Sequence, residues 1–241
     1  MIYAIISDIH SNLEALNTAL DALSNEKIEK YYCAGDIVGY GADPILCIEK
    51  IKKMNMESLM GNHEAGCTGF TGLSYFNDDA KSAIIWTREK ISGSDIEYFG
   101  SFKFVIENDD FTITHGTLDN PESFNYMIDS YHAMKSFQLM KTRILFVGHS
   151  HIPGIFEYKN GKLGYFLKEK IILSNETKYI INIGSVGQPR DGDNRASYAV
   201  YNSEKKEIYI KRVKYNIKKA QEKILKENLP SFLASRLSAG I

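Results

Sequence analysis

Five short apolar runs in this chain each end in side chains that bind metal ions, and this pattern restricts the fold more than any other feature of the sequence. The central run, residues 31–34, leads through Gly35 into Asp36. Open α/β sheets bind ligands at the carboxyl ends of their strands, and glycine permits the sharp turn that such a loop needs. The other four runs, at 2–7, 57–60, 111–114 and 144–147, end in Asp8 and His10, Asn62 and His63, His115, and His149 and His151. We expect five strands that deliver these side chains to one rim.

The spacing of apolar residues between the first runs predicts crossover helices. Four leucines between residues 13 and 23 recur at helical spacing, and Asp43 before Pro44 is typical of the start of a second helix. This alternation of strands and helices indicates a parallel sheet covered by its crossover helices. Two further helices are expected at 78–91 and 131–140, and a glycine-rich loop beside the ligand cluster is expected at 66–74.

Beyond residue 152 consecutive short strands replace the alternating pattern. Asn160-Gly161 between two apolar stretches is typical of a tight hairpin turn. Together with later strands at 179–183, 198–202 and 207–213, this hairpin favours a second sheet packed on the first. Residues 217–237 are predicted to form two short helices interrupted at Pro230, which cover either the core of this chain or a second subunit.

Composition and charge exclude several classes of protein. The 241 residues carry a formal net charge of −1, with 44% hydrophobic and 24% charged residues, which is ordinary for a globular protein. Because this charge gives no general attraction to nucleic acid or to an anionic membrane, neither is an expected partner. We find no repeat, low-complexity tract or linker, so one domain over residues 1–241 is expected, with C-terminal helices from about residue 216.

The cysteines and the N-terminal sequence indicate a reducing compartment. The three cysteines are an odd number without a Cys-x-x-Cys pair, so neither a disulfide framework nor a thiolate zinc site is expected. The chain starts with a strand-like run that lacks the order of a signal peptide, and no apolar run reaches membrane-spanning length. We therefore expect a cytoplasmic protein.

The types of ligand favour two divalent cations. Oxygen ligands together with imidazoles suit manganese, iron or zinc, whereas calcium prefers oxygen alone. Two cations about 3.5–4 Å apart clamp the attacking and leaving oxygens of a phosphoryl displacement and lower the pKa of a water between them. Their mutual repulsion requires a shared carboxylate. Asp36 is the expected bridge, because its loop lies between those of Asp8 and Asn62 in chain order.

Taken together, the five motifs resemble the calcineurin-like metallophosphoesterase family. They occur in the order of the family over residues 8–151, as Asp-x-His, Gly-Asp, Gly-Asn-His-Glu, His-Gly and Gly-His-Ser-His. The resemblance implies the metallo-dependent phosphatase fold, an α/β architecture in which two mixed sheets form a four-layer α/β/β/α sandwich. It also implies metal-dependent hydrolysis of a phosphoric ester.

The resemblance further implies roles for individual residues. The expected metal ligands fall into two sets, Asp8, His10, Asp36 and His151 for one ion, and Asp36, Asn62, His115 and His149 for the other. His63 would not bind metal. The matching histidine of the family lies near the leaving-group oxygen, where it acts as a general acid or stabilises the transition state. Glu64 is expected to support a ligand or to cap a helix.

Within the family the chain is most similar to a small prokaryotic branch often labelled as diadenosine tetraphosphatases. Asn12 follows the first motif, and residues 184–190 read Gly-Ser-Val-Gly-Gln-Pro-Arg, as in that branch. Protein phosphatases of the family carry Asp-Arg-Gly after the bridging motif, and this chain lacks that arginine, which argues against protein phosphatase activity. Arg190 or Arg195 could supply the missing phosphate contact, or both could pair with the neighbouring aspartates.

We therefore expect an enzyme that hydrolyses a small phosphate ester or anhydride, of the nucleotide-type phosphodiester or dinucleotide polyphosphate class. A hydroxide between the two metals would attack phosphorus, and the residues expected to contact the substrate are Asn12, Tyr40 and Arg190. Tyr40 and Phe70 either stack on a base or pack within their loops. The alternative is a non-catalytic metal-binding scaffold of the same fold, as in the retromer subunit, although the complete ligand set argues against it. The choice among monoester, diester and dinucleotide substrates, the native metal and the oligomeric state stay open.

Overall fold

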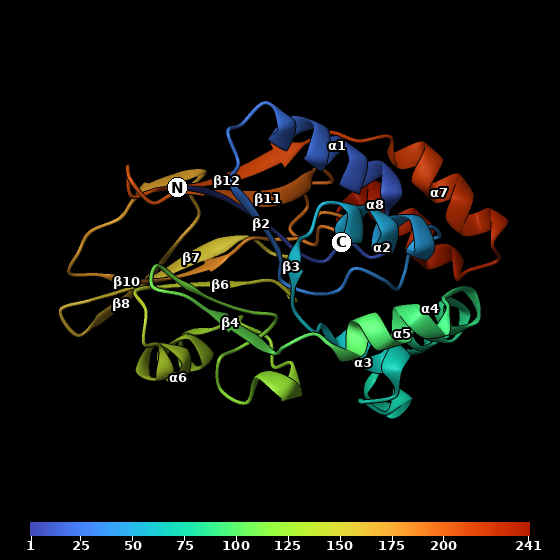
Figure 1. Ribbon diagram of the computed structural model, residues 1–241, viewed down its shortest axis with the longest axis horizontal. Helices are drawn as coiled ribbons and strands as arrows, with labels where there is room; N and C mark the ends of the chain where they lie inside the picture. Colours follow the sequence, from blue (N-terminus) through green and yellow to red (C-terminus); the bar gives the residue numbers. More distant parts are fainter.

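Two six-stranded mixed sheets lie against each other between layers of helices (Figure 1). This arrangement is that of a computed structural model that describes residues 1–241. It confirms the α/β/β/α sandwich that the sequence predicted. None of its helices combines the length and the apolar character needed to cross a lipid bilayer.

The first sheet contains the parallel strands that begin the chain. Its order is β3-β2-β1-β11-β12-β9, in which β1, β2 and β3 run parallel and the other three strands are antiparallel to their neighbours. The bounds of these strands are Glu57–Ser58 (β3), Lys30–Cys33 (β2), Ile2–Ile6 (β1), Ala196–Asn202 (β11), Glu207–Val213 (β12) and Lys170–Ile172 (β9).

The second sheet contains the two remaining strands that end in ligand motifs. Its order is β4-β5-β6-β10-β7-β8, with β5, β6 and β10 parallel. The bounds are Val105–Glu107 (β4), Thr112–Thr114 (β5), Ile144–Val147 (β6), Lys178–Asn182 (β10), Gly154–Lys159 (β7) and Lys162–Phe166 (β8). The hairpin at Asn160-Gly161 is confirmed as the turn between β7 and β8.

The assignment of strands to sheets differs from the prediction in one respect. β11 and β12 were expected in the second sheet, but β11 pairs with β1 in the first, with Ala4 opposite Val200. The five ligand-bearing strands are divided between the sheets, since β5 and β6 belong to the second. Apolar alternation shows which face of a strand is buried, whereas it carries no information about which strand lies beside it.

Helices cover both outer faces of the sandwich. α1 (Leu13–Ser24) and α2 (Pro44–Lys53) pack on the first sheet, and α6 (Ser130–Leu139) packs on the second (Figure 1). The remaining helices are α3 (Asn62–Thr68), α4 (Asp78–Lys90), α5 (Gly93–Gly100), α7 (Ile217–Lys226) and α8 (Ser231–Ala239), with 3-10 turns at Leu73–Tyr75 and Pro121–Ser123.

The loop predicted at 66–74 is only partly a loop. α3 extends to Thr68, and a 3-10 turn follows at Leu73–Tyr75. The first turn of α3 is closed by Glu64, whose carboxylate accepts the Gly61 N–H at 3.1 Å. Glycine lowers helix propensity by only about 1 kcal/mol, so this cap and the burial of the helix outweigh it. α5 was not predicted, because a helix of two turns gives a weak periodic signal.

Aromatic rings fill the core between the two sheets. Phe111 of the second sheet lies edge-on to Tyr3 and Tyr32 of the first, with ring centroids 5.0 and 5.4 Å apart. It also lies edge-on to Phe146 at 5.4 Å. Such edge-to-face pairs add to the stabilisation that comes from burial of the rings. These contacts fix the alignment of the two sheets. They therefore also fix the relative positions of the loops at the carboxyl ends of the strands.

The C-terminal helices cover this chain's own core. Leu229, Leu233 and Leu237 are buried at 6%, 0% and 3% exposure, against α4 and the first loops. Lys223 of α7 lies 2.8 Å from Glu14 and 2.7 Å from Asp43, which ties α7 to the starts of α1 and α2. Of the two alternatives that the sequence left open, docking on the same chain is therefore the one observed.

Candidate metal centre

The loops that carry the predicted ligands have an unusual backbone conformation. Five of these residues have positive φ, a region that non-glycine residues seldom adopt, namely Asp8 (53°), His10 (49°), Asp36 (56°), His149 (64°) and His151 (60°). The loops hold one another in place, since the Asp8 N–H donates to the Gly35 carbonyl at 3.0 Å and the His10 N–H to the Asp36 carbonyl at 2.9 Å. Backbone strain of this kind persists only where the surrounding structure imposes it, and it collects at functional sites.

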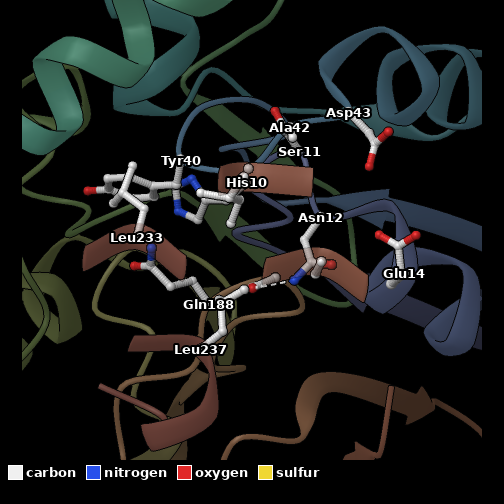
Figure 2. Close-up of a pocket in the computed structure, with 14 residues that line it drawn as sticks. His10, Ser11, Asn12, Glu14, Tyr40, Ala42, Asp43, Gln188, Leu233 and Leu237 are labelled. Carbon is white, nitrogen blue, oxygen red and sulfur yellow. Dashed lines mark hydrogen bonds between the residues drawn. The ribbon is translucent and has the colours of Figure 1, made fainter. Parts of the chain in front are cut away.

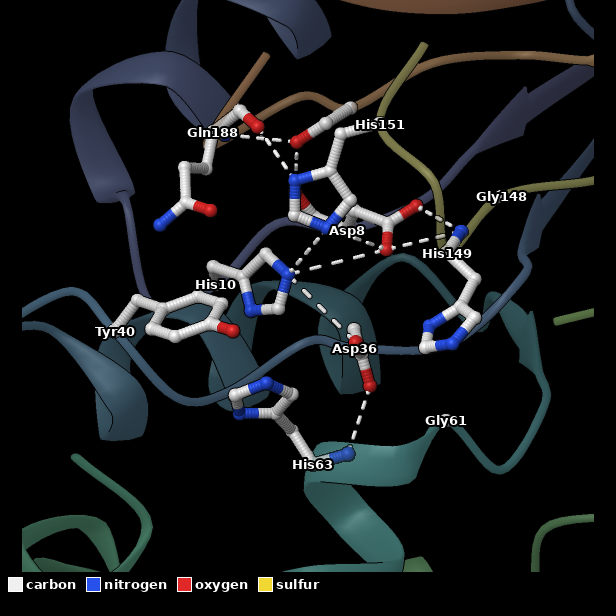
Figure 3. Close-up of polar contacts among 12 residues, drawn as sticks. Asp8, His10, Asp36, Tyr40, Gly61, His63, Gly148, His149, His151 and Gln188 are labelled. Carbon is white, nitrogen blue, oxygen red and sulfur yellow. Dashed lines mark hydrogen bonds and ion pairs between the residues drawn. The ribbon is translucent and has the colours of Figure 1, made fainter. Parts of the chain in front are cut away.

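The predicted ligands converge in two groups that share Asp36. Figure 3 shows the group that contains Asp8, His10, Asp36 and His151, with His149 beside it. Within each group the possible ligand atoms all lie within 4.8 Å of one another. One group contains Asp8, His10, Asp36 and His151, and the other contains Asp36, His115 and His149. Asn62 adjoins the second group, because its Oδ1 lies 3.1 Å from the Nε2 of His115. The structure thus brings together all seven residues that the sequence nominated as ligands.

Asp36 faces both groups. Its Oδ2 lies 3.6 Å from the Nε2 of His10 in the first group and 3.3 Å from the Nε2 of His115 in the second. Its Oδ1 accepts the His63 N–H at 2.9 Å, which fixes the rotation of the carboxylate. The other oxygen is therefore directed between the two groups, as a bridging ligand requires.

The donor set fits divalent cations. The Nδ1 atoms of His10 and His151 lie 3.2 and 2.5 Å from the carbonyls of Val38 and Gln188. A carbonyl only accepts, so each Nδ1 carries the proton and each Nε2 presents a lone pair. The two Nε2 atoms face each other at 3.1 Å, where two lone pairs repel each other and a shared cation would be attracted by both.

Electrostatics keep the carboxylates of the site anionic. Burial opposes the charge of Asp36, but the imidazoles of His115 and His63 outweigh it and hold the pKa of Asp36 well below its ordinary value. Burial also opposes charge on His115, yet Asp36 and Asp8 raise the pKa of this imidazole to about 9. Burial, with the charge of His115, lowers the pKa of His149 to about 3. Anionic oxygens and neutral imidazoles are the forms that bind metal, so His149 is ready to bind, whereas His115 carries a proton that a metal ion must displace.

Glu64 supports the loop that carries Asp36. Its Oε2 accepts the Asp36 N–H at 2.8 Å and its Oε1 accepts the Val38 N–H at 3.1 Å. Because these donors are buried, the carboxylate supplies the partners that the strained loop cannot find in a strand or helix. The structure therefore bears out the expected supporting position of Glu64.

His63 lies beside the ligand groups and outside both of them. Its ring packs edge-on against His10 and Tyr40, with centroid distances of 4.7 and 4.5 Å (Figure 3). It also packs edge-on against Phe76 at 5.6 Å. The ring lies against the backbone at Gly39, where an added Cβ would lie 2.0 Å from the Nδ1 of His63. Burial lowers the pKa of His63 to about 4, so the ring is neutral near pH 7 and carries one N–H donor.

The three residues expected to contact the substrate differ in their surroundings. Both polar atoms of Asn12 are bonded within the protein, because its Oδ1 caps α1 at the Ala15 N–H and its Nδ2 donates to the Gly187 carbonyl. Tyr40 is buried, with its ring 4.5 Å from that of His10. Arg190 donates to the Gln188 side chain and forms no ion pair with an acidic residue. Asn12 thus joins two loops, whereas Tyr40 and Arg190 border the metal centre.

Of the two roles predicted for Arg195, the structure shows the ion pair with a neighbouring aspartate. Its guanidinium lies 2.6 Å from Asp193 and donates to both carboxylate oxygens, which lowers the pKa of Asp193 to about 2. The competing prediction, a phosphate contact from Arg195, is therefore not supported by its position. Arg190 differs from Arg195, because it forms no ion pair with either neighbouring aspartate.

Two residues beside the centre were missed by the sequence reasoning. Tyr126 stacks on His149 with centroids 4.0 Å apart and planes 13° apart. Arg236 of α8 lies 6.0 Å from the centroid of the Tyr40 ring, and Arg190 lies 5.8 Å from the same centroid. Neither Tyr126 nor Arg236 belongs to a motif or follows a ligand strand, so no signal in the sequence marks them.

The C-terminal helices close one flank of the centre. Leu233 and Leu237 of α8 line a cavity of about 10 Å³ together with His10, Tyr40 and Gln188 (Figure 2). A space this small holds one water at most. A substrate must therefore reach the ligand groups from another side.

The comparison with known families identifies the group of proteins to which this site belongs. Residues 1–206 match the calcineurin-like phosphoesterase superfamily domain. The chain belongs to the calcineurin-like phosphoesterase superfamily. Its membership accounts for the order of the ligand motifs and for the paired groups around Asp36.

Relatives of this calcineurin-like phosphoesterase span its whole length. An uncharacterized protein of Methanocaldococcus jannaschii, MJ0912, is 43% identical over 243 residues, which cover 98% of this chain and 97% of that protein. A metallophosphoesterase from Sphaerobacter thermophilus has the same fold, with a TM-score of 0.86 and 34% identity over 100% of this chain and 99% of that one. The hypothetical protein PH1004 from Pyrococcus horikoshii shares the fold at 22% identity, with a TM-score of 0.80 over 100% and 98% of the two chains.

Proposed function

We propose that this protein is a dimetal-dependent hydrolase of small phosphate esters or anhydrides, with substrates of the nucleotide type. The observation that carries the proposal is the pair of buried carboxylate and imidazole groups that share Asp36. Both the superfamily and the donor set support it. The proposed cofactors are two divalent ions of manganese, iron or zinc.

The ligand roles follow from the two groups. Asp8, His10, Asp36 and His151 would hold one ion, and Asp36, Asn62, His115 and His149 would hold the other. When bound, two such ions supply Lewis-acid polarisation of a phosphoryl oxygen and an acidified water as nucleophile. The protein contributes the fixed positions of these donors, which the interlocked loops provide.

His63 is the proposed partner of the leaving group. Its main-chain N–H donates to the Asp36 carboxylate at 2.9 Å, which holds the residue beside the ligand groups. The ring N–H would donate to the oxygen that gains negative charge as the ester bond breaks. This role depends on position beside the ligand groups, and no other imidazole of the cluster stands outside them.

Arg190 and Arg236 are the proposed contacts to non-bridging phosphate oxygens. Both guanidiniums lie near Tyr40, and neither pairs with an aspartate or glutamate. Burial, followed by the neighbouring charge of Arg190, lowers the pKa of Arg236, whose Nε donates to the main-chain oxygen of Ile241 at 2.6 Å. Phosphate is the anion that the planar guanidinium fork binds best.

Phosphate release and ester cleavage by the manganese-loaded protein test the proposal. The substrates are bis(4-nitrophenyl) phosphate, 4-nitrophenyl phosphate, AMP and diadenosine tetraphosphate, and bound metal is counted in parallel. We expect turnover of at least one substrate that disappears in Asp36→Ala and survives in Asp21→Ala, an exposed aspartate of α1. Two bound metals without turnover of any of them would favour the non-catalytic scaffold instead.

A further inference from the structure

A cleft of about 510 Å³ opens beside the metal centre, and aromatic rings form much of its wall. It lies between the segment 69–77 and the segment 117–129. Its aromatic residues are Tyr40, Phe70, Tyr75, Phe76, Phe124 and Tyr126. Sites for small molecules typically have volumes of about 300–1,000 Å³ and apolar or aromatic walls with a few polar groups.

Three of these rings are exposed at the mouth of the cleft. Tyr75 is 85% exposed, Phe70 is 56% exposed and Tyr126 is 44% exposed. Single exposed apolar residues are ordinary, whereas several gathered around one cavity indicate a binding surface. The ring of Phe70 rests against that of Phe104, with centroids 5.2 Å apart, so it is supported although it is largely exposed.

The cleft is continuous with the second group of ligands. Asn62 and His149 form part of its lining. Tyr126 stacks on His149 at 4.0 Å, and Phe124 lies 6.0 Å from the ring of His115. A molecule whose phosphate lies at the metal centre would therefore extend its organic part along these rings.

The charge of the lining restricts what that organic part can be. Glu122 is the one residue of the lining with a formally charged side chain other than histidine. A second phosphate in this cleft would meet a carboxylate and no cation, whereas a flat uncharged ring would meet stacking faces and polar groups such as Asn77, Thr71 and Ser123. Arg190 and Arg236 do not belong to the lining.

One wall of the cleft is held in shape before any ligand arrives. Phe124 is buried at φ 50° and ψ 40°, a conformation that a bulky residue adopts only under constraint. The constraint comes from the Thr117 N–H, which donates to the Asn125 carbonyl at 2.9 Å. A wall fixed in this way lowers the entropic cost of binding a rigid ring.

We propose that this cleft binds the nucleobase of a mononucleotide-type substrate, with the base between the exposed rings and its phosphate at the metal centre. The proposal rests on the proposed hydrolase function and narrows its substrate class. It places one base per substrate in the cleft. Stacking on aromatic side chains would provide the affinity, and it would tolerate different bases, since every base has a π-face.

A pair of substrates that differ only by the base provides the test. AMP and ribose 5-phosphate carry the same phosphate on the same primary hydroxyl, so their ratio of kcat/KM isolates the contribution of the base. We expect the manganese-loaded protein to favour AMP by about tenfold or more, since stacking contributes on the order of 1–3 kcal/mol per base. Phe70→Ala and Tyr75→Ala should each bring the ratio to about threefold or less, with an unchanged value for ribose 5-phosphate.

Tyr131→Ala is the matched control for Tyr75→Ala. Tyr131 is 63% exposed on α6 and does not line the cleft, so the ratio should stay at the wild-type value. Circular dichroism of the variants excludes a folding defect as the cause of a changed ratio.

Binding of adenosine separates this proposal from the proposed hydrolase function. Adenosine contains no phosphate, and saturation-transfer NMR detects its contact with the protein whether or not any ester is cleaved. We expect transfer to the base protons in the wild type and in Tyr131→Ala, and its loss in the Phe70→Ala, Tyr75→Ala double variant. Hydrolysis with equal kcat/KM for AMP and ribose 5-phosphate, or adenosine transfer that survives the double variant, would overturn the base site and leave the hydrolase intact. Adenosine transfer without any turnover would support the base site and count against the hydrolase.

Discussion

His63 is the histidine of this site that lies beside the ligand groups and belongs to neither. Replacement by alanine should leave both metals bound, because the ring contacts the ligands only through its edges. The rate should fall by about 10²–10⁴, the contribution typical of a positioned proton donor. Steady-state kinetics and metal analysis on the same sample measure both quantities.

The control for this substitution is His132→Ala. His132 lies on α6, pairs with Asp129 and takes no part in the cluster, so both rate and metal content should stay unchanged. A His63→Ala protein that retains the wild-type rate would remove this residue from the mechanism, whereas loss of metal would make it a ligand.

Gly39 offers an independent test of the same imidazole. Alanine at this position meets a φ of 88° and places its Cβ 2.0 Å from the Nδ1 of His63, so the ring must move. We expect Gly39→Ala to bind two metals and to lose at least about 10² in rate, as an incorrectly placed proton donor does.

Gly93→Ala is the matched change, because an added Cβ there meets nothing within 4 Å. We expect Gly93→Ala to leave metal binding and the rate unchanged in the same assay. Full activity in Gly39→Ala would mean that the place of His63 is unimportant.

At this scale the sequence identified the residues that belong to motifs and missed those that do not. The metal-ligand residues could be predicted because each follows an apolar run. The carboxyl ends of neighbouring strands form the edge where open α/β sheets bind ligands, so side chains there are expected to lie close together. Arg236 comes from a helix more than forty residues beyond Arg190, so its approach to Tyr40 depends on how α8 docks. Asn12 caps α1, and a linear pattern does not distinguish such an N-cap residue, two positions after a motif, from a residue that contacts substrate. Its contact with substrate stays a prediction.

The packing of α8 places Arg236, a proposed phosphate contact, beside Tyr40. Arg236→Gln keeps much of the side-chain length and its packing but removes the charge beside Arg190. For a phosphomonoester we expect kcat/KM to fall by about tenfold, mainly through KM, since a charge-assisted hydrogen bond contributes about 1.5–3 kcal/mol.

Arg143→Gln is the comparison for this change. Arg143 donates to the Asn175 carbonyl on the exposed surface, so its loss should not alter KM. An Arg236→Gln protein with unaltered KM would show that α8 only covers the site.

Among the elements, apolar periodicity predicted the existence of most helices and strands. The run at 13–23 became α1, and Pro230 separates α7 from α8 as expected. Pairing between distant strands could not be predicted, because the contact between β1 and β11 joins residues nearly two hundred positions apart and depends on the whole core. The helical turn at 66–68 depends on Glu64, a contact that glycine content conceals.

For the molecule as a whole, metal removal should lower stability without unfolding the chain. An ion that binds only the folded state at about 100 times its dissociation constant adds about 2.7 kcal/mol to the free energy of unfolding. For a chain of this size we expect each bound manganese ion to raise Tm by roughly 5–10 °C, and a chelator to reverse the rise. Differential scanning calorimetry measures the shift.

Far-UV circular dichroism should stay unchanged on chelation at 25 °C, because the aromatic core between the sheets does not include the ligands. Equal Tm values in manganese and in chelator would show that the two groups do not bind the ion.

The donors are divided between the two sheets. Asp8 and Asp36 follow strands of one sheet, and His115 and His149 follow strands of the other. A pair of bound ions would therefore cross-link the two sheets. Any substitution that shifts one sheet against the other, even at Phe111 in the interior, changes the distances between the ligands that the ions must bridge. The affinity for the ions therefore depends on the packing of the whole interior. A screen for variants with weakened ion binding would identify substitutions at core positions that do not contact the ions.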